Sequence, residues 1–329
     1  MKLRKRRMLS GMQPSGRMHL GNWLGALDSW IKYQQDYDAY FFVADWHALS
    51  TNYADTTRLR EYIREMLLDW LSAGINPDKC TVFIQSRVPE HAVLHLLLSM
   101  ITPVPWLERN PTYKEKIEEL RERDLTTYGF LGYPVLQSAD ILIYKADVVP
   151  VGVDQLPHLE LTRELARRFN HLYAAVFPEP QPLLTEVPKL LGTDGRKMSK
   201  SYNNAIYLSD PEKDVREKLR TMVTDPARIR RTDRGNPDLC PVFSYHKIFS
   251  AIGVIDRVNT ECRTAAIGCI DCKKLAADRM VQRLEPIWTE REKWAKHPKK
   301  VEAVVAEGSE KAGKVARATL EEVREAIKL

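Results

Sequence analysis

Apolar and polar positions follow two different periods over the first two hundred residues. The segments 6–12, 39–44, 81–86 and 147–152 read as strands, and the continuous apolar run at 39–44 is typical of a strand buried on both faces. The segments 20–31, 55–73, 90–101 and 154–170 instead repeat apolar residues every three or four positions, which predicts helices. Asp55 or Thr56 is expected to cap the second of them, and Gly74 to follow its end. Strands alternating with helices predict an α/β fold with a doubly wound parallel sheet.

The pattern changes in the second half of the chain. A proline-rich segment at 177–184 suggests a boundary, and a Gly/Ser-rich loop follows at 192–204. From Asp210 onward only helices and loops are expected, ending in a long polar helix at 299–329. We therefore expect a Rossmann-like catalytic domain at 1–205, a smaller all-helical domain at 206–300, and a terminal helix at 301–329 whose packing the pattern leaves open.

Composition narrows the class of protein. The 329 residues are 44% hydrophobic and 29% charged, which excludes a disordered or fibrous chain. No apolar run is long enough for a membrane span, and the basic start lacks the apolar stretch of a secretory signal, so a cytoplasmic location is expected. The net charge of +6 is mild, but 12 basic and 7 acidic residues fall between 189 and 234, so the excess lies in the second half.

The first strand-to-helix crossover carries Gln13-Pro14-Ser15-Gly16 and then His19-Leu20-Gly21-Asn22. This is where a doubly wound sheet binds phosphorylated ligands, because glycines allow close approach and a helix N-terminus favours anionic oxygens. A glycine-containing turn beside a surface histidine is the plain alternative.

A second motif, Lys197-Met198-Ser199-Lys200-Ser201, lies in the later loop. Two lysines three positions apart can both turn toward a polyphosphate and stabilise the charge that builds on departing pyrophosphate. A solvated basic loop is the alternative reading.

Four of the five cysteines, Cys240, Cys262, Cys269 and Cys272, have the spacing C-x21-C-x6-C-x2-C. Four thiolates suit Zn2+ or an iron–sulfur cluster, and spacing alone does not choose between them. The fifth, Cys80, stands in an apolar stretch and is expected to be a small buried side chain.

The paired motifs resemble the HxGH and KMSKS signatures of class I aminoacyl-tRNA synthetases, the first being present as HLGN. Three segments, 13–27, 133–144 and 149–170, resemble the tryptophanyl-tRNA synthetases, so the likeness covers most of 8–205. It implies catalytic roles for Gln13, His19, Lys197 and Lys200. It implies tryptophan binding by Tyr133, Gln137, Asp140 and Gln155, and ATP binding by Gln13, Pro14, Ser15, His19, Gly21, Asn22, Gly152, Val153, Asp154, Lys197, Met198, Ser199, Lys200 and Ser201.

Within this resemblance, Asp140 accepts the indole N–H, and a ligand without that group would leave the buried carboxylate unpaired. For Asp140 a structural pairing with Lys145 is the alternative. Asn22 replaces the final histidine of the general class signature, and Val153 stands where many relatives have glutamate, so the local contact at 153 is uncertain.

The resemblance also covers the cysteines, because some bacterial members hold a [4Fe–4S] cluster on a set with one more residue in the first gap. A [4Fe–4S] cluster is therefore expected, with zinc as the alternative. Basic residues near the set are expected to meet tRNA phosphates: Arg228, Arg230, Arg231, Arg234, Lys273, Lys274, Arg279 and Arg283.

The implied reaction joins L-tryptophan to ATP, releases pyrophosphate with the help of Mg2+, and transfers the amino acid to tRNA(Trp). A homodimer and no membrane contact are expected. Three alternatives remain: a tyrosyl enzyme of the same class, another nucleotidyltransferase with an HxGH-like site, and a non-catalytic tRNA-binding protein.

Overall fold

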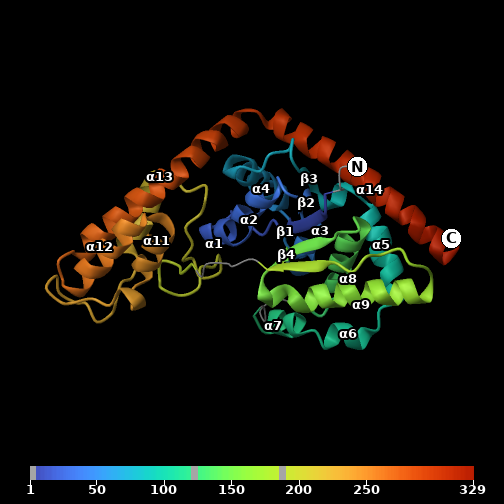
Figure 1. Cartoon of the computed structure of the whole chain (residues 1–329), viewed down its shortest axis with the longest axis horizontal. Coiled ribbons are helices and arrows are strands. Elements are labelled where there is room, and N and C mark those ends of the chain that lie inside the picture. The colour runs from blue at the N-terminus through green and yellow to red at the C-terminus, as the bar shows by residue number, and fades with distance from the viewer. Residues whose placement is uncertain (1–4, 120–124, 185–189) are drawn as a thin grey trace.

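The computed structural model describes residues 5–119, 125–184 and 190–329. Its centre is a five-stranded parallel sheet in the order β3-β2-β1-β4-β5, surrounded by helices (Figure 1). The strands are β1 (Arg7–Met12), β2 (Asp38–Val43), β3 (Thr81–Ile84), β4 (Val148–Val151) and β5 (Gln181–Leu184). The predicted doubly wound α/β fold is confirmed, and four of these strands lie where the apolar runs placed them.

Alternate residues of the central strands pack on opposite faces of the sheet. On β2, Phe41 belongs to one apolar core and Phe42 to the other. The first face is covered by α1 (Leu20–Asn22), the π-helical turn η1 (Trp23–Leu27), α2 (Asp28–Tyr33) and α4 (Leu59–Ala73). The second is covered by α5 (Glu90–Ser99), α8 (Tyr128–Ile143) and α9 (Leu156–Leu172). Burial on both faces explains why these strands are continuously apolar.

Local boundaries differ from the predicted ones in three places. The helix predicted from 55 begins at Leu59, with Arg58 at its N-cap position, while Asp55 caps only the turn before it through the amide of Thr57. Residues 153–155 form a 3-10 turn, η3, ahead of α9. The helix predicted over 20–31 is interrupted by the wider turn of η1. Gly74 ends α4 with φ 120°, a conformation that favours glycine.

The fifth strand, β5, lies inside the proline-rich segment that suggested a boundary. It pairs only with β4, at the edge of the sheet. An edge strand tolerates Pro182 because only one side of the strand needs hydrogen-bond donors. The segment between β2 and α4 also forms a helix, α3 (Asp45–Asn52), which periodicity did not indicate.

Residues from 210 onward form helices and loops, as expected. The helices there are α10 (Glu212–Thr221), η4 (Pro237–Leu239), α11 (Pro241–Phe249), α12 (Ile252–Arg263), α13 (Cys269–Lys296) and α14 (Pro298–Ile327). Together α10 to α12 and the start of α13 form a helical body beside the sheet domain (Figure 1). Among the described helices, none has the length and apolar character needed to cross a membrane.

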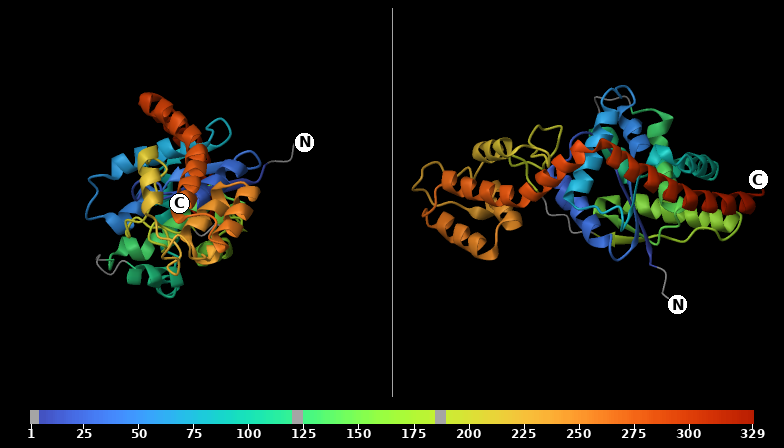
Figure 2. Two further views of the ribbon diagram at one scale, coloured as in Figure 1. Left: turned by 90° about the vertical axis from the view of Figure 1, so that its left-hand side faces the viewer. Right: turned by 90° about the horizontal axis from the view of Figure 1, so that it is seen from above.

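The terminal helix α14 runs back over the sheet domain (Figure 2). Its first half contributes Val301 and Val305 to one core, and its second half contributes Ala316 and Leu320 to the other. It crosses at the edge strand β3, where a Cβ on Gly308 would lie 1.9 Å from the carbonyl oxygen of Val82. Glycine therefore permits the helix to cover an edge that would otherwise offer free backbone groups.

Candidate active site

A cavity opens at the point where the strand order reverses, between β1 and β4. The chain proceeds from β1 to β2 and β3 on one side and places β4 on the other, and ligands bind at this switch point in doubly wound sheets. The cavity measures about 190 Å³ and is lined from β1 by Ser10 and Gly11 and from β4 by Val149 and Val151. Five residues singled out in the sequence also line it, namely Gln13, Tyr133, Gln137, Asp140 and Gln155.

Asp140 is fully buried at the inner end of this cavity, on α8. Its Oδ1 accepts from Nδ1 of His91 at 2.6 Å and from Nε2 of Gln85 at 2.7 Å. Its Oδ2 accepts from Nε2 of His47 at 2.7 Å. A carboxylate oxygen takes about two hydrogen bonds, so Oδ2 retains acceptor capacity beside the cavity.

These donors keep Asp140 ionised despite its burial. Burial alone raises the pKa of this carboxyl group, but the hydrogen bonds and charges of His47 and His91 outweigh it and hold the pKa below its ordinary value. His91 is in turn oriented by the hydroxyl of Tyr144, 2.7 Å from its Nε2. The alternative pairing of Asp140 with Lys145 is wrong, because Lys145 bonds to Glu322 at 2.6 Å.

The cavity mouth carries neutral polar groups. The hydroxyl of Tyr133 lies 2.9 Å from Nε2 of His158, and burial raises the pKa of this phenol, so it stays protonated. Gln155 donates to Asp154 at 2.9 Å, at the start of α9. Gly152 precedes them, and a Cβ there would meet Oδ1 of Asp154 at 2.5 Å. Val153 is largely exposed and does not line the cavity.

The HLGN crossover and the KMSKS loop lie together, although 175 residues or more separate them. His19 forms a bridge with Tyr207, and Leu20 donates to the carbonyl of Ile206 at 2.9 Å, so the chain just after the loop pairs with the crossover. A Cβ on Gly21 would lie 3.0 Å from the His19 ring and 4.0 Å from Sδ of buried Met198. The ammonium group of Lys200 lies 3.2 Å from the hydroxyl of Ser15.

Side-chain hydrogen bonds hold the loop in this position. The side chain of Asn204 accepts from the amide of Ser199 at 2.8 Å and donates to Asp194 at 2.7 Å. Ser199 and Ser201 share a hydroxyl–hydroxyl bond of 2.8 Å. Lys197 is exposed, so its ammonium group is free to swing toward a ligand.

The electrostatics of this region favour an anion. Burial, followed by the positive charge of Lys200 and then of Lys197, lowers the pKa of His19 to about 4. Burial lowers the pKa of Lys200 to about 8. His19 is therefore neutral at neutral pH, and its Nδ1 accepts from the amide of Asn22 at 3.2 Å, which leaves Nε2–H available as a donor.

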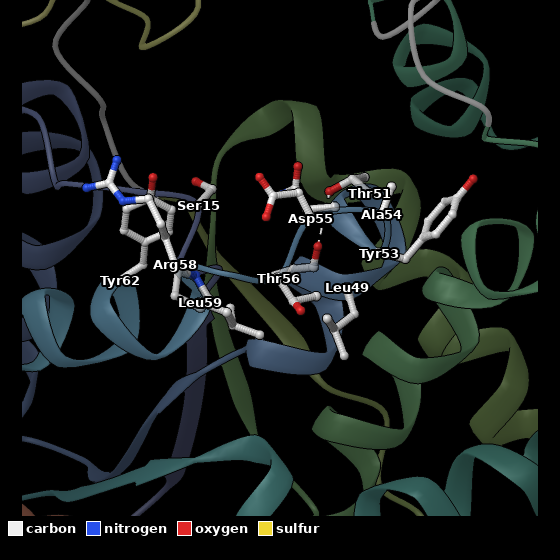
Figure 3. Close-up of a pocket in the computed structure, with 13 residues that line it drawn as sticks. Ser15, Leu49, Thr51, Tyr53, Ala54, Asp55, Thr56, Arg58, Leu59 and Tyr62 are labelled. Atoms are coloured by element: carbon white, nitrogen blue, oxygen red, sulfur yellow. Dashed lines mark hydrogen bonds between the residues drawn. The ribbon is translucent and has the colours of Figure 1, made fainter.

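A larger cavity of about 590 Å³ adjoins Ser15 on the far side of this crossover (Figure 3). Pro14 and Ser15 line it together with α3 and the residues that lead into α4. In Figure 3, Ser15, Arg58 and Tyr62 lie at one end and Tyr53 at the other. The Ser15 side of the crossover is therefore open, whereas the Asp140 side is narrow.

The four cysteines lie in the helical body, at the N-cap of α11, near the end of α12 and in the first turn of α13. Their thiols lie close enough to influence one another: burial first, and then the other three cysteines, raise the pKa of Cys272 to about 12. The guanidinium of Arg228 lies 3.6 Å from Sγ of Cys262, and a Cβ on Gly235 would lie 2.6 Å from the same sulfur. All four are free thiols, and within the described residues no three metal-ligating side chains are placed to hold an ion.

Two of the basic residues expected to meet tRNA have structural positions instead. Arg228 is buried and donates to the carbonyl of Ile267 at 2.6 Å, and Arg231 donates to the carbonyl of Ala265 at 2.7 Å. Both tie the loop between α10 and η4 to the cysteine region. Arg283 lies over the ring of Trp23, 5.0 Å from its centroid. The expectation of a tRNA contact is therefore wrong for Arg228, whose guanidinium is enclosed.

Sequence reasoning missed His47, Gln85 and His91, the three donors to Asp140. Two of them follow the carboxyl ends of β2 and β3 within four residues, which is the edge where ligands meet a parallel sheet. Their place just after the ends of β2 and β3 could therefore have identified His47 and Gln85 as candidate site residues.

The family model described as tRNA synthetases class I (W and Y) matches residues 1–285. The tryptophan–tRNA ligase of Thermotoga maritima is 54% identical over 98% of this chain and 99% of its own. That of Aquifex aeolicus is 43% identical over 98% of this chain and 100% of its own. Among solved structures, the tryptophanyl-tRNA synthetase of Campylobacter jejuni complexed with ADP and tryptophan superposes with a TM-score of 0.90 at 30% identity, covering 98% of this chain and 100% of that one.

Proposed function

The chain belongs to the class I tRNA synthetases for tryptophan and tyrosine, and from that membership we propose that it is the ligase that activates L-tryptophan with ATP and transfers it to tRNA(Trp). The tryptophan carboxylate attacks the α-phosphorus of ATP, and pyrophosphate leaves. The 2′-hydroxyl of the terminal tRNA adenosine then attacks the aminoacyl carbonyl and releases AMP.

One observation carries the choice of amino acid: a buried, ionised carboxylate with spare acceptor capacity lies at the inner end of a cavity at the switch point. In this proposal Oδ2 of Asp140 accepts the indole N–H. The hydroxyl of Tyr133 and the amide of Gln155 hold the ammonium group, and Gln137, one turn before Asp140 on α8, contacts the ring. Phenylalanine offers no N–H, so its binding would leave the acceptor unpaired.

The phosphate part of the substrate is assigned to the crossover and the loop. His19 donates from Nε2, Gln13 lies between the two ligand halves, and Lys197 and Lys200 bind the departing pyrophosphate. Mg2+ arrives as part of the ATP substrate and shares the neutralisation of its phosphates. No side-chain nucleophile is required, because positioning and preorganised positive charge lower the barrier. The open cavity beside Ser15 gives room on this side.

Amino-acid-dependent exchange between ATP and pyrophosphate tests the activity. Exchange with L-tryptophan and not with L-tyrosine is expected. A preference for tyrosine would replace the proposal with the tyrosyl branch of the family, and no exchange with either would favour a non-catalytic role. Charging of tRNA(Trp) transcript tests the second step.

We also propose that residues 206–300 form the tRNA-recognising domain, and that the four cysteines there hold a [4Fe–4S] cluster. The donor chemistry fits, because the four thiols lie near enough to influence one another, and Gly235 leaves space beside the sulfur of Cys262. Among the described residues, the four cysteine side chains are not positioned to coordinate a metal ion. The cluster would be structural or contact tRNA, since aminoacylation transfers no electrons.

Anaerobic purification with iron, zinc and sulfide analysis tests this assignment. A brown protein with about four irons and four sulfides per chain is expected. A colourless protein with one zinc per chain would replace the cluster by the zinc alternative, and a metal-free folded protein would reject both.

A homodimer is proposed from an exposed apolar face on the second side of the sheet domain. Three large side chains of α5 and its C-terminal end are exposed there: Val93, Leu96 and Met100. A patch of this kind on a globular surface marks an interface. Light scattering should give twice the chain mass, and Leu96→Asp with Met100→Asp should give the single mass. The cytoplasm, where tRNA is charged, is the proposed location.

A further inference from the structure

A third cavity lies where the two long helices α13 and α14 meet, on the opposite side of α3 from the tryptophan site. We name it the elbow pocket and define it by its apolar floor (Ile63, Leu67, Ile84, Val301), its aromatic wall (Trp294) and the polar groups Asp45 and Ser86 at its base. It measures about 700 Å³, a volume that suits a small molecule. None of the roles assigned above uses it.

The rim of the elbow pocket is cationic. Arg60, Arg64, Arg87 and Lys299 line it, against the two carboxylates of Asp45 and Glu302. Arg87 binds Glu302, with 3.1 Å between Nη2 and Oε2, and Arg64 lies 3.8 Å from Glu65. Arg60 and Lys299 have no ion pair within the part of the chain that the structure describes. Oδ1 of Asp45 is turned toward the protein by the amide of Ser86 at 3.0 Å. An apolar floor under unpaired cations fits a ligand with an apolar body and one anionic group.

The same short segments that build the elbow pocket also hold Asp140. In the 3-10 turn η2 (Gln85–Arg87), Gln85 donates to Asp140 at 2.7 Å, the amide of Ser86 binds Asp45, and Arg87 reaches α14. In α3, Asp45 lines the elbow pocket, and His47, two residues on, bonds to Asp140 at 2.7 Å. A shift of η2 or of the start of α3 therefore moves a donor to the indole-reading carboxylate.

We propose that the elbow pocket binds a small aromatic anion, with a ring on the apolar floor beside Trp294 and one carboxylate, sulfonate or phosphate between Arg60 and Lys299, and that its occupancy is linked to the tryptophan site through η2 and α3. The linkage rests on the function proposed above, whereas the binding itself does not. Linkage between two sites is reciprocal, so each ligand changes the affinity of the other by the same factor.

The fluorescent probe 1-anilinonaphthalene-8-sulfonate, an apolar ring system with one sulfonate, tests the binding on the full chain. Lys299→Gln and Arg60→Gln should each weaken its binding at least fivefold. Lys300→Gln, the neighbouring exposed lysine that does not line the pocket, should change it less than twofold. Ala295→Trp should weaken binding by filling the cavity. Equal effects of Lys299→Gln and Lys300→Gln would overturn the site.

Tryptophan titrations with and without the probe test the linkage. The tryptophan dissociation constant should change at least threefold and then level off as the probe saturates, and tryptophan should change the probe's constant by an equal factor. No change, or unequal factors, overturns the linkage. A shift that grows without limit means that the probe competes inside the tryptophan cavity, and it overturns the site as well. Failure of tryptophan to bind in the absence of probe counts against the proposed function, not against the elbow pocket.

Discussion

The ammonium group of Lys200 donates to the hydroxyl of Ser15 at 3.2 Å, across 185 residues of chain. The contact brings the second lysine of the KMSKS loop against the turn that opens the first helix, beside His19. A triphosphate that lay over this turn would contact both His19 and Lys200. Lys200 would then face the departing pyrophosphate.

Replacing Lys200 by alanine should slow tryptophan-dependent ATP–pyrophosphate exchange by about 10²–10³-fold, the loss expected for one preorganised charge. Tryptophan binding measured by calorimetry should stay within about twofold, because Lys200 does not line the tryptophan cavity. Lys213→Ala, an exposed lysine on α10, serves as the matched control and should leave exchange unchanged. Wild-type exchange rates in Lys200→Ala would remove this lysine from the reaction.

The pH profile should report the titration of Lys200. Because burial lowers its pKa to about 8, the lysine is charged below pH 8 and loses its charge as the pH rises through that value. The kcat/KM for ATP, which reports the free enzyme, should therefore fall above about pH 8 toward tenfold per unit. His19, with its pKa lowered to about 4, is neutral throughout and adds no inflection between pH 6 and 10.

The Lys200→Arg variant keeps the positive charge at position 200 but removes its titration near pH 8. Arginine stays protonated over this range, so any activity it retains should be flat with pH. A flat wild-type profile up to pH 9.5 would contradict the assignment of the inflection.

Asp140→Asn should reduce discrimination between tryptophan and phenylalanine by about 2–3 kcal/mol, or roughly 30–150-fold in relative kcat/KM. Asparagine has the same size as aspartate, so the variant removes the negative charge that the three donors bind but leaves their packing unchanged. Exchange assays with both amino acids measure the effect, and a thermal melt checks folding. Unchanged selectivity in a folded variant would mean that another group reads the indole N–H.

Gly308→Ala should destabilise the chain severely, by several kcal/mol, because the new methyl group would meet the backbone of β3 at the carbonyl of Val82. Gly253→Ala on α12 is the matched control: a Cβ there meets nothing within 4 Å, and it should stabilise the helix by about 0.5–1 kcal/mol. Urea unfolding of both variants measures the difference. Equal stabilities would show that α14 does not press against β3.

The sheet was predictable because burial on both faces makes β2, β3 and β4 mostly apolar and leaves the buried apolar pair Met8 and Leu9 in β1. The same logic fails for β5, where the edge position removes the need for a fully apolar strand and admits Pro182. The helix α3 is short and carries polar side chains that serve the cavities on either side of it, so it has no apolar stripe to detect.

Site residues that belong to sequence motifs were predictable, whereas residues that only tertiary packing brings to the site were not. Gln13, Tyr133, Asp140 and Gln155 meet in one cavity, where the residues that follow β1 and β4 converge with one side of α8. The donors to Asp140 come from three other elements, α3, η2 and α5, and no spacing relates His47, Gln85 and His91 to position 140. Arg228 shows the converse limit, since a basic cluster in the sequence does not reveal which guanidinium is enclosed.

Because α14 returns across β3 and packs on both cores of the sheet domain, the helical body lies between two segments of the chain that belong to that domain. A fragment ending at residue 205 would lack Val305, Ala316 and Leu320. It would expose the edge of the sheet at β3 and part of both apolar cores. Residues 298–327 thus belong to the same folding unit as β1, and a chain under synthesis cannot complete the sheet domain until α14 has emerged.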